Sequence, residues 1–329
     1  MTALRLNISL LVLMLLLFIL SLGVGPAELG FRESFHGLFA GGGEAAAIIM
    51  RKIRLPRALL GLMIGFTLGL SGAVLQGFLR NPLAEPGIIG VSSTAAFGAV
   101  LVFYSGLAGS ALYALPAGAL MGALIAVIAL LALSARGGST LTLILAGVAL
   151  SSLSGALTSL VLNLSPNPFA AYEIIFWLLG ALKDRSMDHV WIAAPLMVIG
   201  GLLIAASARA IDALSLGEEA AASMGIHMPR ARLLIVAGVA LGVGAATAVA
   251  GTIGFIGLVV PHLIRPLTNR MPSALLLPSA LGGAALLLAS DVAVRVILPA
   301  GELNVGVLTA LIGAPFFLWL VARARREML

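Results

Sequence analysis

The chain has 329 residues, of which 61% are apolar and only 10% are charged, and its formal net charge is +6. A soluble domain carries about 25% charged residues, because its water-facing surface needs them. The composition therefore excludes a soluble enzyme, a DNA-binding protein and a disordered chain, and it indicates a membrane protein. The chain has no cysteine, which excludes disulfides, thiolate metal sites and redox pairs.

The candidate spans are stretches that lack Asp, Glu, Lys and Arg, since a spanning helix needs about 20 apolar residues. Two of them, 86–135 and 233–264, are long enough for two helices each, with turn-forming segments after Tyr104 and around Gly251. The sequence therefore predicts an all-α polytopic membrane protein with about ten transmembrane helices in a single domain, residues 1–329. The stretches are 7–27, 58–79, 86–135, 137–172, 189–208, 233–264, 271–290 and 303–322.

The first stretch is longer than the apolar region of a typical signal peptide and has no convincing small-residue cleavage site, so we expect a retained helix. Ten spans place both termini on one side of the membrane. If that side is cytoplasmic, its loops hold eleven basic and five acidic residues, whereas the opposite loops hold eight of each. The positive-inside rule therefore favours cytoplasmic termini. The basic segment 51–57 is an exception, because this topology places it outside.

Small residues repeat every four positions within the stretch 58–79, which predicts a helix face that another backbone can approach closely. The pattern Gly-x-x-Leu-Gly-x-x-x-Ala starts at Gly65 and again at Gly238, in spans of opposite direction. Such a pattern is typical of an inverted repeat in a transporter, but small residues at this spacing also occur in any membrane bundle. The repeated residues are Gly61, Gly65, Gly69, Ala73 and Gly77.

Polar segments interrupt the apolar pattern at three places. The first, 76–87, contains two prolines and forms either a tight turn or a pore-lining constriction. The second, 209–232, contains a short helix after Leu216 that ends at Gly225, and a soluble partner can grip such a helix. The third, 251–265, contains His262, which has no second ligand at metal-binding spacing and is best interpreted as structural.

Two charges lie close together near the end of the ninth span. Asp291 and Arg295 are four residues apart, so they are either functional intramembrane charges or a simple ion pair on one helix face. No Walker, His-Glu-x-x-His or nucleophile-elbow motif is present. The sequence predicts no catalytic residue, no metal site, no cofactor and no nucleic-acid partner.

At these segments the chain resembles the permease subunits of ABC importers for vitamin B12, haem and ferric siderophores. The resemblance runs along nearly the whole chain, in the expected order. It rests on Ile53-Arg-Leu-Pro-Arg, Ser71-Gly-Ala-Val-Leu-Gln-Gly, Arg80-Asn-Pro-Leu-Ala-Glu-Pro-Gly, Leu145-Ala-Gly-Val-Ala-Leu, Gly254-Phe-Ile-Gly-Leu-Val-Val-Pro-His and Gly313-Ala-Pro-Phe-Phe.

The resemblance implies a homodimer in the inner membrane, with two cytoplasmic ATPases, a substrate-binding protein outside and no enzymatic activity of the permease itself. It implies three sets of site residues. Binding-protein docking falls on Arg54, Arg57 and Arg295. ATPase coupling falls on Glu218, Glu219, Ala220, Ala221 and Gly225. The cytoplasmic gate falls on Asn81, Leu83 and, less securely matched, Thr140.

Two other functions compete with an importer permease. A secondary transporter would need a buried carboxylate at mid-membrane, and only Glu173 and Asp291 come near a span, each towards its end. A membrane enzyme such as a prenyltransferase would need an acidic metal cluster, and the loops carry none. Among substrates, an iron chelate, haem included, is favoured over a corrinoid.

Overall fold

A computed structural model describes residues 3–25, 27, 29–39, 44–109, 113–135, 140–165, 167–269, 271–298 and 303–327. In these ranges the chain is helical and has no strands. Eight helices of the described chain are long and apolar enough to span a membrane, and three shorter apolar helices, α5, α8 and α13, accompany them, which agrees with the predicted architecture of about ten transmembrane helices. With α5 and α13, which continue the bundle, the helices that match the predicted spans are α1 (Ala3–Gly23), α4 (Leu55–Phe78), α5 (Val91–Tyr104), α6 (Ala114–Ala135), α7 (Thr140–Asn163), α9 (Met187–Ala206), α12 (Met228–Ala250), α13 (Ile256–Ile264), α14 (Pro272–Ile297) and α15 (Val305–Glu327).

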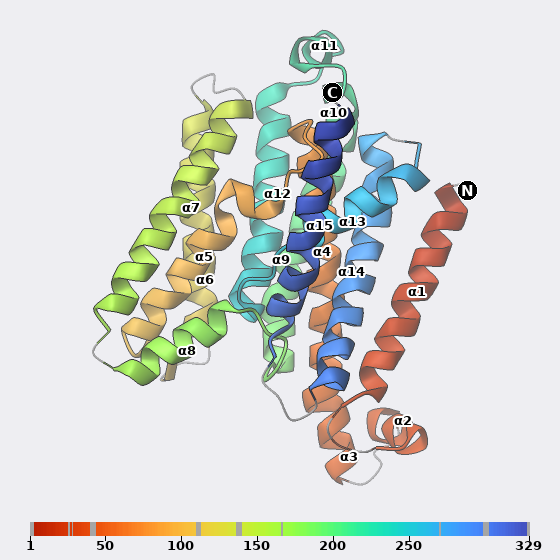
Figure 1. Cartoon of the computed structure of the whole chain (residues 1–329), viewed down its shortest axis with the longest axis vertical. Helices are drawn as coiled ribbons and strands as arrows, with labels where there is room; N and C mark the ends of the chain where they lie inside the picture. The colour runs from red at the N-terminus through yellow and green to blue at the C-terminus, as the bar shows by residue number, and fades with distance from the viewer. Residues whose placement is uncertain are drawn as a thin grey trace.

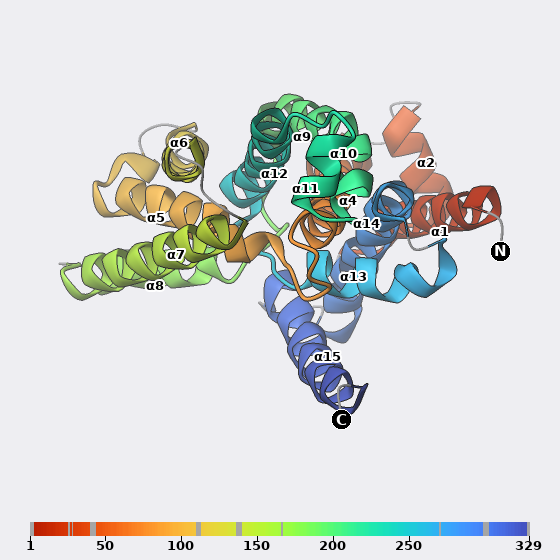
Figure 2. The same ribbon diagram turned by 90° about the horizontal axis from the view of Figure 1, so that it is seen from above.

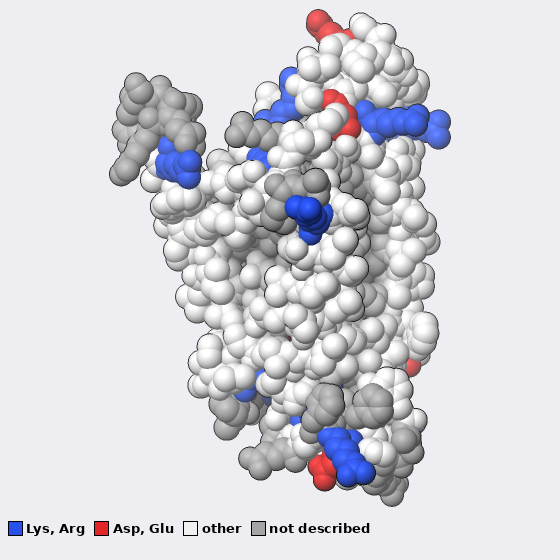
Figure 3. Space-filling model, turned by 90° about the vertical axis from the view of Figure 1, so that its right-hand side faces the viewer, with Lys and Arg blue, Asp and Glu red and all other residues white. Residues whose placement is uncertain are grey.

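Short helices occupy the two ends of this bundle. At one end lie α2 (Phe31–Phe39), α3 (Glu44–Ile48), the following π-helical turn (Ile49–Arg54) and α8 (Pro168–Leu178). At the other end lie α10 (Ala208–Leu214) and α11 (Glu218–Ser223), together with both ends of the chain (Figure 1). We call these the α2 end and the α11 end. Charged side chains on the face in Figure 3 lie towards these two ends, and the broad band between them is almost free of charge, as a lipid-facing belt requires.

The glycine stripe of α4 packs against α14, as its spacing predicted. A Cβ added to Gly65 would lie 2.4 Å from the carbonyl oxygen of Gly283, and one on Gly69 would lie 2.1 Å from that of Ser279. Gly72 is equally tight against Gly257 of α13, at 1.9 Å. Real Cβ atoms do not approach this closely, so α4 contacts two neighbours backbone to backbone.

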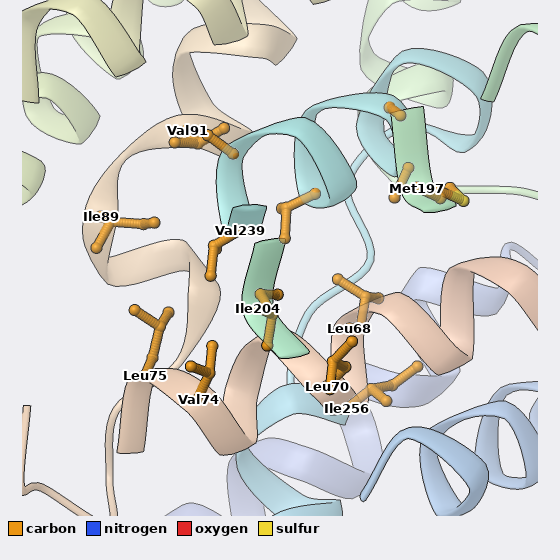
Figure 4. Close-up of a cluster of buried hydrophobic side chains, with 14 of the residues drawn as sticks. Leu68, Leu70, Val74, Leu75, Ile89, Val91, Met197, Ile204, Val239 and Ile256 are labelled. Atoms are coloured by element: carbon orange, nitrogen blue, oxygen red, sulfur yellow. The ribbon is translucent and has the colours of Figure 1, made fainter. Parts of the chain in front are cut away.

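The core lies where α4, α9, α12 and α13 meet. Buried Leu68 and Leu75 of α4, Ile204 of α9, Val239 of α12 and Ile256 of α13 belong to one apolar cluster (Figure 4). By contrast, only 11% of the span in α7 and 28% of that in α15 is buried within the chain, against 78% for α4 and α12. Seen from above, α15 and the α7–α8 pair leave the central helices in different directions (Figure 2).

Candidate functional site

Two non-helical segments lie against each other inside the bundle, one between α4 and α5 and one between α12 and α13. Glu85 precedes the 3-10 turn Pro86–Ile89 of the first break, and its Oε1 accepts a hydrogen bond of 2.5 Å from the backbone N–H of Phe255 in the second. Phe255 is left-handed, with φ of +67°, and it is the N-cap of α13. The carboxylate therefore satisfies an otherwise free donor at a helix N-terminus, where the helix dipole favours negative charge.

Glu85 thus lies beside the N-terminus of α13. From Phe255 to the end of α13 at Ile264 the chain is helical, and at about 1.5 Å per residue this N-terminus lies about 13 Å from the other end of α13. Glu85 is a half-buried carboxylate within the bundle, in addition to Glu173 and Asp291, to which the sequence pointed. It already has a backbone partner, so its presence does not require an ion site.

Gln76 strengthens the same junction from α4. Its buried side-chain amide donates to the carbonyl oxygens of Ala84 at 3.4 Å and Gly257 at 3.3 Å. Its oxygen accepts a 2.5 Å hydrogen bond from Arg265, which follows α13. The end of α4, the break after it and both ends of α13 are therefore joined by one polar network.

Two connected cavities lie beside this junction. The smaller, of about 300 Å³, is lined by Glu85, Ser92 and Ser93 among other residues. The larger, of about 630 Å³, opens to the surface between the end of α8 and α15. Both are lined by Thr252 and Gly254. The larger cavity has mainly apolar walls, which suit passage of a bulky solute better than tight coordination of a small one.

The predicted gate residues form a turn at the α11 end. The side chain of exposed Asn81 accepts a hydrogen bond of 2.9 Å from the backbone N–H of half-buried Leu83, and Arg80 has φ of +49°. This is the Asx-turn geometry that Asn favours. Thr140 is the first residue of α7, and its side chain lies outside the described residues.

The predicted coupling segment forms the short helix that its sequence indicated. The helix α11 covers Glu218–Ser223, and Gly225 follows it with φ of +82°, the left-handed conformation of a C-terminal glycine cap. Ala220 is half-buried, Ala221 is buried and Glu219 is exposed. An ion pair of 3.1 Å between Glu218 and Arg232 joins α11 to α12.

Polar and apolar contacts give this segment a defined surface. Asp212 of α10 accepts a 2.8 Å hydrogen bond from the backbone N–H of Ser273 at the start of α14. Leu216 and Met224, on either side of α11, are 69% and 63% exposed. Exposed apolar side chains beyond the spans suit burial in a groove of a soluble partner.

At the α2 end, two arginines bind the carboxylate of Asp291, which is 1% exposed, and a third, Arg54, lies one helical turn before the first of them. Arg57 of α4 donates to both oxygens of Asp291 at 2.8–3.1 Å. Arg295, one turn further along α14, pairs with it at 2.7 Å, which confirms the predicted i,i+4 pair. We call Arg54, Arg57, Arg295 and Asp291 the arginine cluster.

The arginine cluster also binds the end of α1. Arg54 donates to the carbonyl oxygens of Leu22 and Gly23 at 3.0 Å, and Arg295 donates to those of Ser21 and Val24 at 2.8 and 2.6 Å. The last carbonyls of a helix lack intrahelical partners and carry partial negative charge, which cations stabilise. These contacts give the basic segment 51–57 an internal role that the sequence did not reveal.

The three predicted docking arginines are thus brought together, but they differ in exposure. Arg54 is 4% exposed and the side chain of Arg295 is 6% exposed, while that of Arg57 is 18% exposed. Arg57 presents the most accessible guanidinium of the three. The roles of Glu85 and Gln76, and the pairing of Asp291 with Arg57, were not predicted from the sequence. For Glu85 and Gln76 the only signal was a polar side chain next to a proline or a glycine.

A bundle of about ten apolar helices with interior breaks, an open apolar cavity and a short helix beyond the spans defines a transport subunit of the membrane. The FecCD transport family model matches residues 13–323, and the chain belongs to this family. It is the permease subunit of an ABC importer, and ATP hydrolysis belongs to a separate subunit.

Known proteins that match most or nearly all of this chain support the assignment. The chain is 43% identical to the cobalamin import system permease protein of Halobacterium salinarum, covering 84% of this chain and 74% of the relative. It is 38% identical to the hemin transport system permease protein of Yersinia pestis, covering 96% and 95% of the two chains. A solved structure of a metal-chelate type ABC transporter in an inward-facing conformation superposes with a TM-score of 0.87 and 32% identity, covering 97% of this chain and 99% of that one.

Proposed function

We propose that two copies of this chain face each other in the inner membrane and form the translocation pathway between them. The observation that carries this proposal is the cavity of about 630 Å³ between α8 and α15, which is open to the surface. The spans of α7 and α15 are weakly buried within the chain, and they offer apolar surface to a second copy. FecCD permeases work within ABC importers, often as dimers.

The two ends then have different partners. The α11 end faces the cytoplasm, with both termini, and each copy receives one ATPase on Glu218, Glu219, Ala220, Ala221 and Gly225. The turn at Asn81 and Leu83, with Thr140 at the start of α7, forms the cytoplasmic gate. The α2 end faces outward, and Arg54, Arg57 and Arg295 orient a substrate-binding protein. The positive-inside charge distribution supports this orientation.

The proposed substrate is a large metal chelate: haem, a ferric siderophore or a corrinoid. The named relatives transport cobalamin and hemin, and the structural neighbour is of metal-chelate type. The walls of the larger cavity are mostly apolar, with Leu178, Val307 and Leu311 among their residues. Such walls let a bulky solute pass without tight binding, so the binding protein sets most of the specificity.

The test is reconstitution of the permease in liposomes with its ATPase and binding protein. We expect uptake of one of three chelates, cyanocobalamin, haemin or a ferric hydroxamate, only with ATP and the binding protein present. Uptake driven by a proton or sodium gradient without the ATPase would instead establish a secondary transporter. Absence of ATP-dependent uptake for all three would contradict the substrate class, while stable ATPase association would still support the importer assembly.

A further inference from the structure

The connection between α8 and α9 places a further arginine, Arg185, at the α2 end. Leu182 in this connection is buried, and its Cδ1 lies 3.3 Å from where a Cβ on Gly61 would be. Gly61 is one helical turn beyond Arg57 on α4. Arg185 follows Leu182 by three residues, a span of at most about 11 Å. It therefore belongs to the same end of the bundle as the arginine cluster, although neither its sequence position nor the family resemblance pointed to it.

The guanidinium of Arg185 differs from those of the arginine cluster because it has no protein partner among the described residues. Its Nε is buried without a hydrogen bond, and neither terminal nitrogen forms one. Burial lowers the pKa of Arg185, with the charge of neighbouring Asp184 acting in the opposite direction. The cation has thus lost part of its hydration without gaining an acceptor in the described part of the chain.

The backbone on both sides holds this side chain in place. Asp184 has φ of +58°, a left-handed conformation that is uncommon for residues other than glycine. Ser186 forms a capping box with His189 at the start of α9, and the backbone N–H of Ser186 donates to Nδ1 of His189 at 3.2 Å. These contacts fix the backbone from which the side chain of Arg185 extends, so the backbone needs little ordering when a partner binds.

We propose that Arg185 receives a carboxylate of the substrate-binding protein, and so forms a docking contact at the same end of the bundle as the arginine cluster. This inference rests on the proposed function, because it requires that the α2 end faces outward and binds such a partner. A carboxylate matches the planar fork of a guanidinium in two parallel hydrogen bonds. The half-buried position favours a contact that lengthens the lifetime of the complex, since a desolvated charge pair mainly affects dissociation.

The experiment measures dissociation of the binding protein from the intact importer in nanodiscs. The binding protein used is the one that copurifies with the tagged wild-type importer after crosslinking. We expect Arg185→Gln to speed dissociation about tenfold or more. Arg185→Lys should recover part of the loss, because it keeps the charge without the fork. The matched control is Lys183→Gln, at an exposed neighbouring position, which should change the rate less than about twofold.

Folding is checked on the same samples by monodispersity and ATPase association, which Arg185→Gln should leave intact. A carboxylate-to-amide change on the binding protein should cost little further lifetime in the Arg185→Gln background, as expected for a direct pair. Wild-type dissociation kinetics in Arg185→Gln would overturn this inference but leave the proposed function standing. If phosphatidylglycerol raises the thermal stability of the wild-type importer but not that of the Arg185→Gln variant, and dissociation is unchanged, Arg185 binds a lipid phosphate and the docking role is wrong. If the wild-type importer binds no such protein, the docking part of the proposed function fails first.

Discussion

The two ends of the molecule hold their charged residues in different ways. At the α2 end, Arg57, Arg295 and Asp291 form a buried cluster that joins α4 and α14, and arginines of the same cluster bind the last carbonyls of α1. At the α11 end, a turn at Asn81 and a six-residue helix are each held by one or two polar contacts. The difference indicates a cross-linked, rigid platform at the α2 end and segments with fewer polar contacts at the α11 end.

The largest effect is expected from breaking α11, because this short helix carries the predicted coupling residues and is flanked by exposed Leu216 and Met224. Proline cannot adopt the φ of +82° at Gly225, so Gly225→Pro should disrupt the end of the helix. Glu218→Lys with Glu219→Lys replaces the ion pair to Arg232 by repulsion. Either change should abolish recovery of the ATPase in a detergent pull-down and abolish transport.

Insertion in the membrane should survive these changes, because they alter no span. The matched control is Ser223→Ala, an exposed position of the same helix, which should leave ATPase recovery unchanged. Normal recovery and transport in the double lysine variant would show that α11 does not couple the ATPase.

The second effect tests the rigid end. Asp291→Ala leaves Arg57 and Arg295 without their shared counter-ion in a buried site. Removing one partner of a buried ion pair typically costs about 3–5 kcal/mol. We expect a clear fall in the thermal unfolding temperature of the purified permease, while Asp188→Ala, at an exposed position of the same end, should change it much less. Equal stability of both variants would mean that the cluster does not cross-link the helices.

The same comparison explains what the sequence predicts well. Spans follow from length and hydropathy, and the stripe at Gly65 and Gly69 follows from spacing within one helix. Local signals also gave α11 and its end at Gly225. These features depend on residues close together in the chain, so periodicity and capping preferences suffice.

The polar networks depend on residues far apart, and so they escaped prediction. Arg57 and Asp291 are separated by 234 positions, and Glu85 and Phe255 by 170. Glu85 meets Phe255 where α13 begins, and beside this point Gly72 of α4 packs on Gly257 of α13, which is again a contact between distant parts of the chain. The family resemblance supplied the docking, coupling and gate residues, but it gave no indication that Arg54 and Arg295 bind the end of α1.

A third, smaller effect concerns the gate. Leu83→Ala with Asn81→Ala removes a half-buried side chain and the hydrogen bond that closes the turn. Because the proposed gate seals by close packing, we expect permeation through liposomes without substrate or ATP to rise several-fold, and ATP hydrolysis to lose its dependence on the binding protein. The control is Pro82→Ala, at an exposed position of the same turn. A double variant as tight as the wild type would leave this segment as a turn without a sealing role.

The smallest effect is expected at Arg57, where the rigid platform meets the proposed partner. Charge reversal at Arg54 or Arg295 would also break contacts to α1, so its effect on docking could not be separated from damage to the fold. Arg57→Gln avoids this problem, because Asp291 keeps its pair with Arg295.

A rim charge pair contributes roughly 0.2–1 kcal/mol and acts mainly on the association rate. We therefore expect association of the binding protein to slow by about 1.5- to 5-fold at low salt, and the difference to vanish near 1 M salt, where the Debye length is about 3 Å. Basal ATP hydrolysis should stay unchanged, because the coupling segment lies at the other end. An association rate that equals the wild-type rate at every salt concentration would show that docking does not use Arg57, and that the arginine cluster serves only to hold α1, α4 and α14 together.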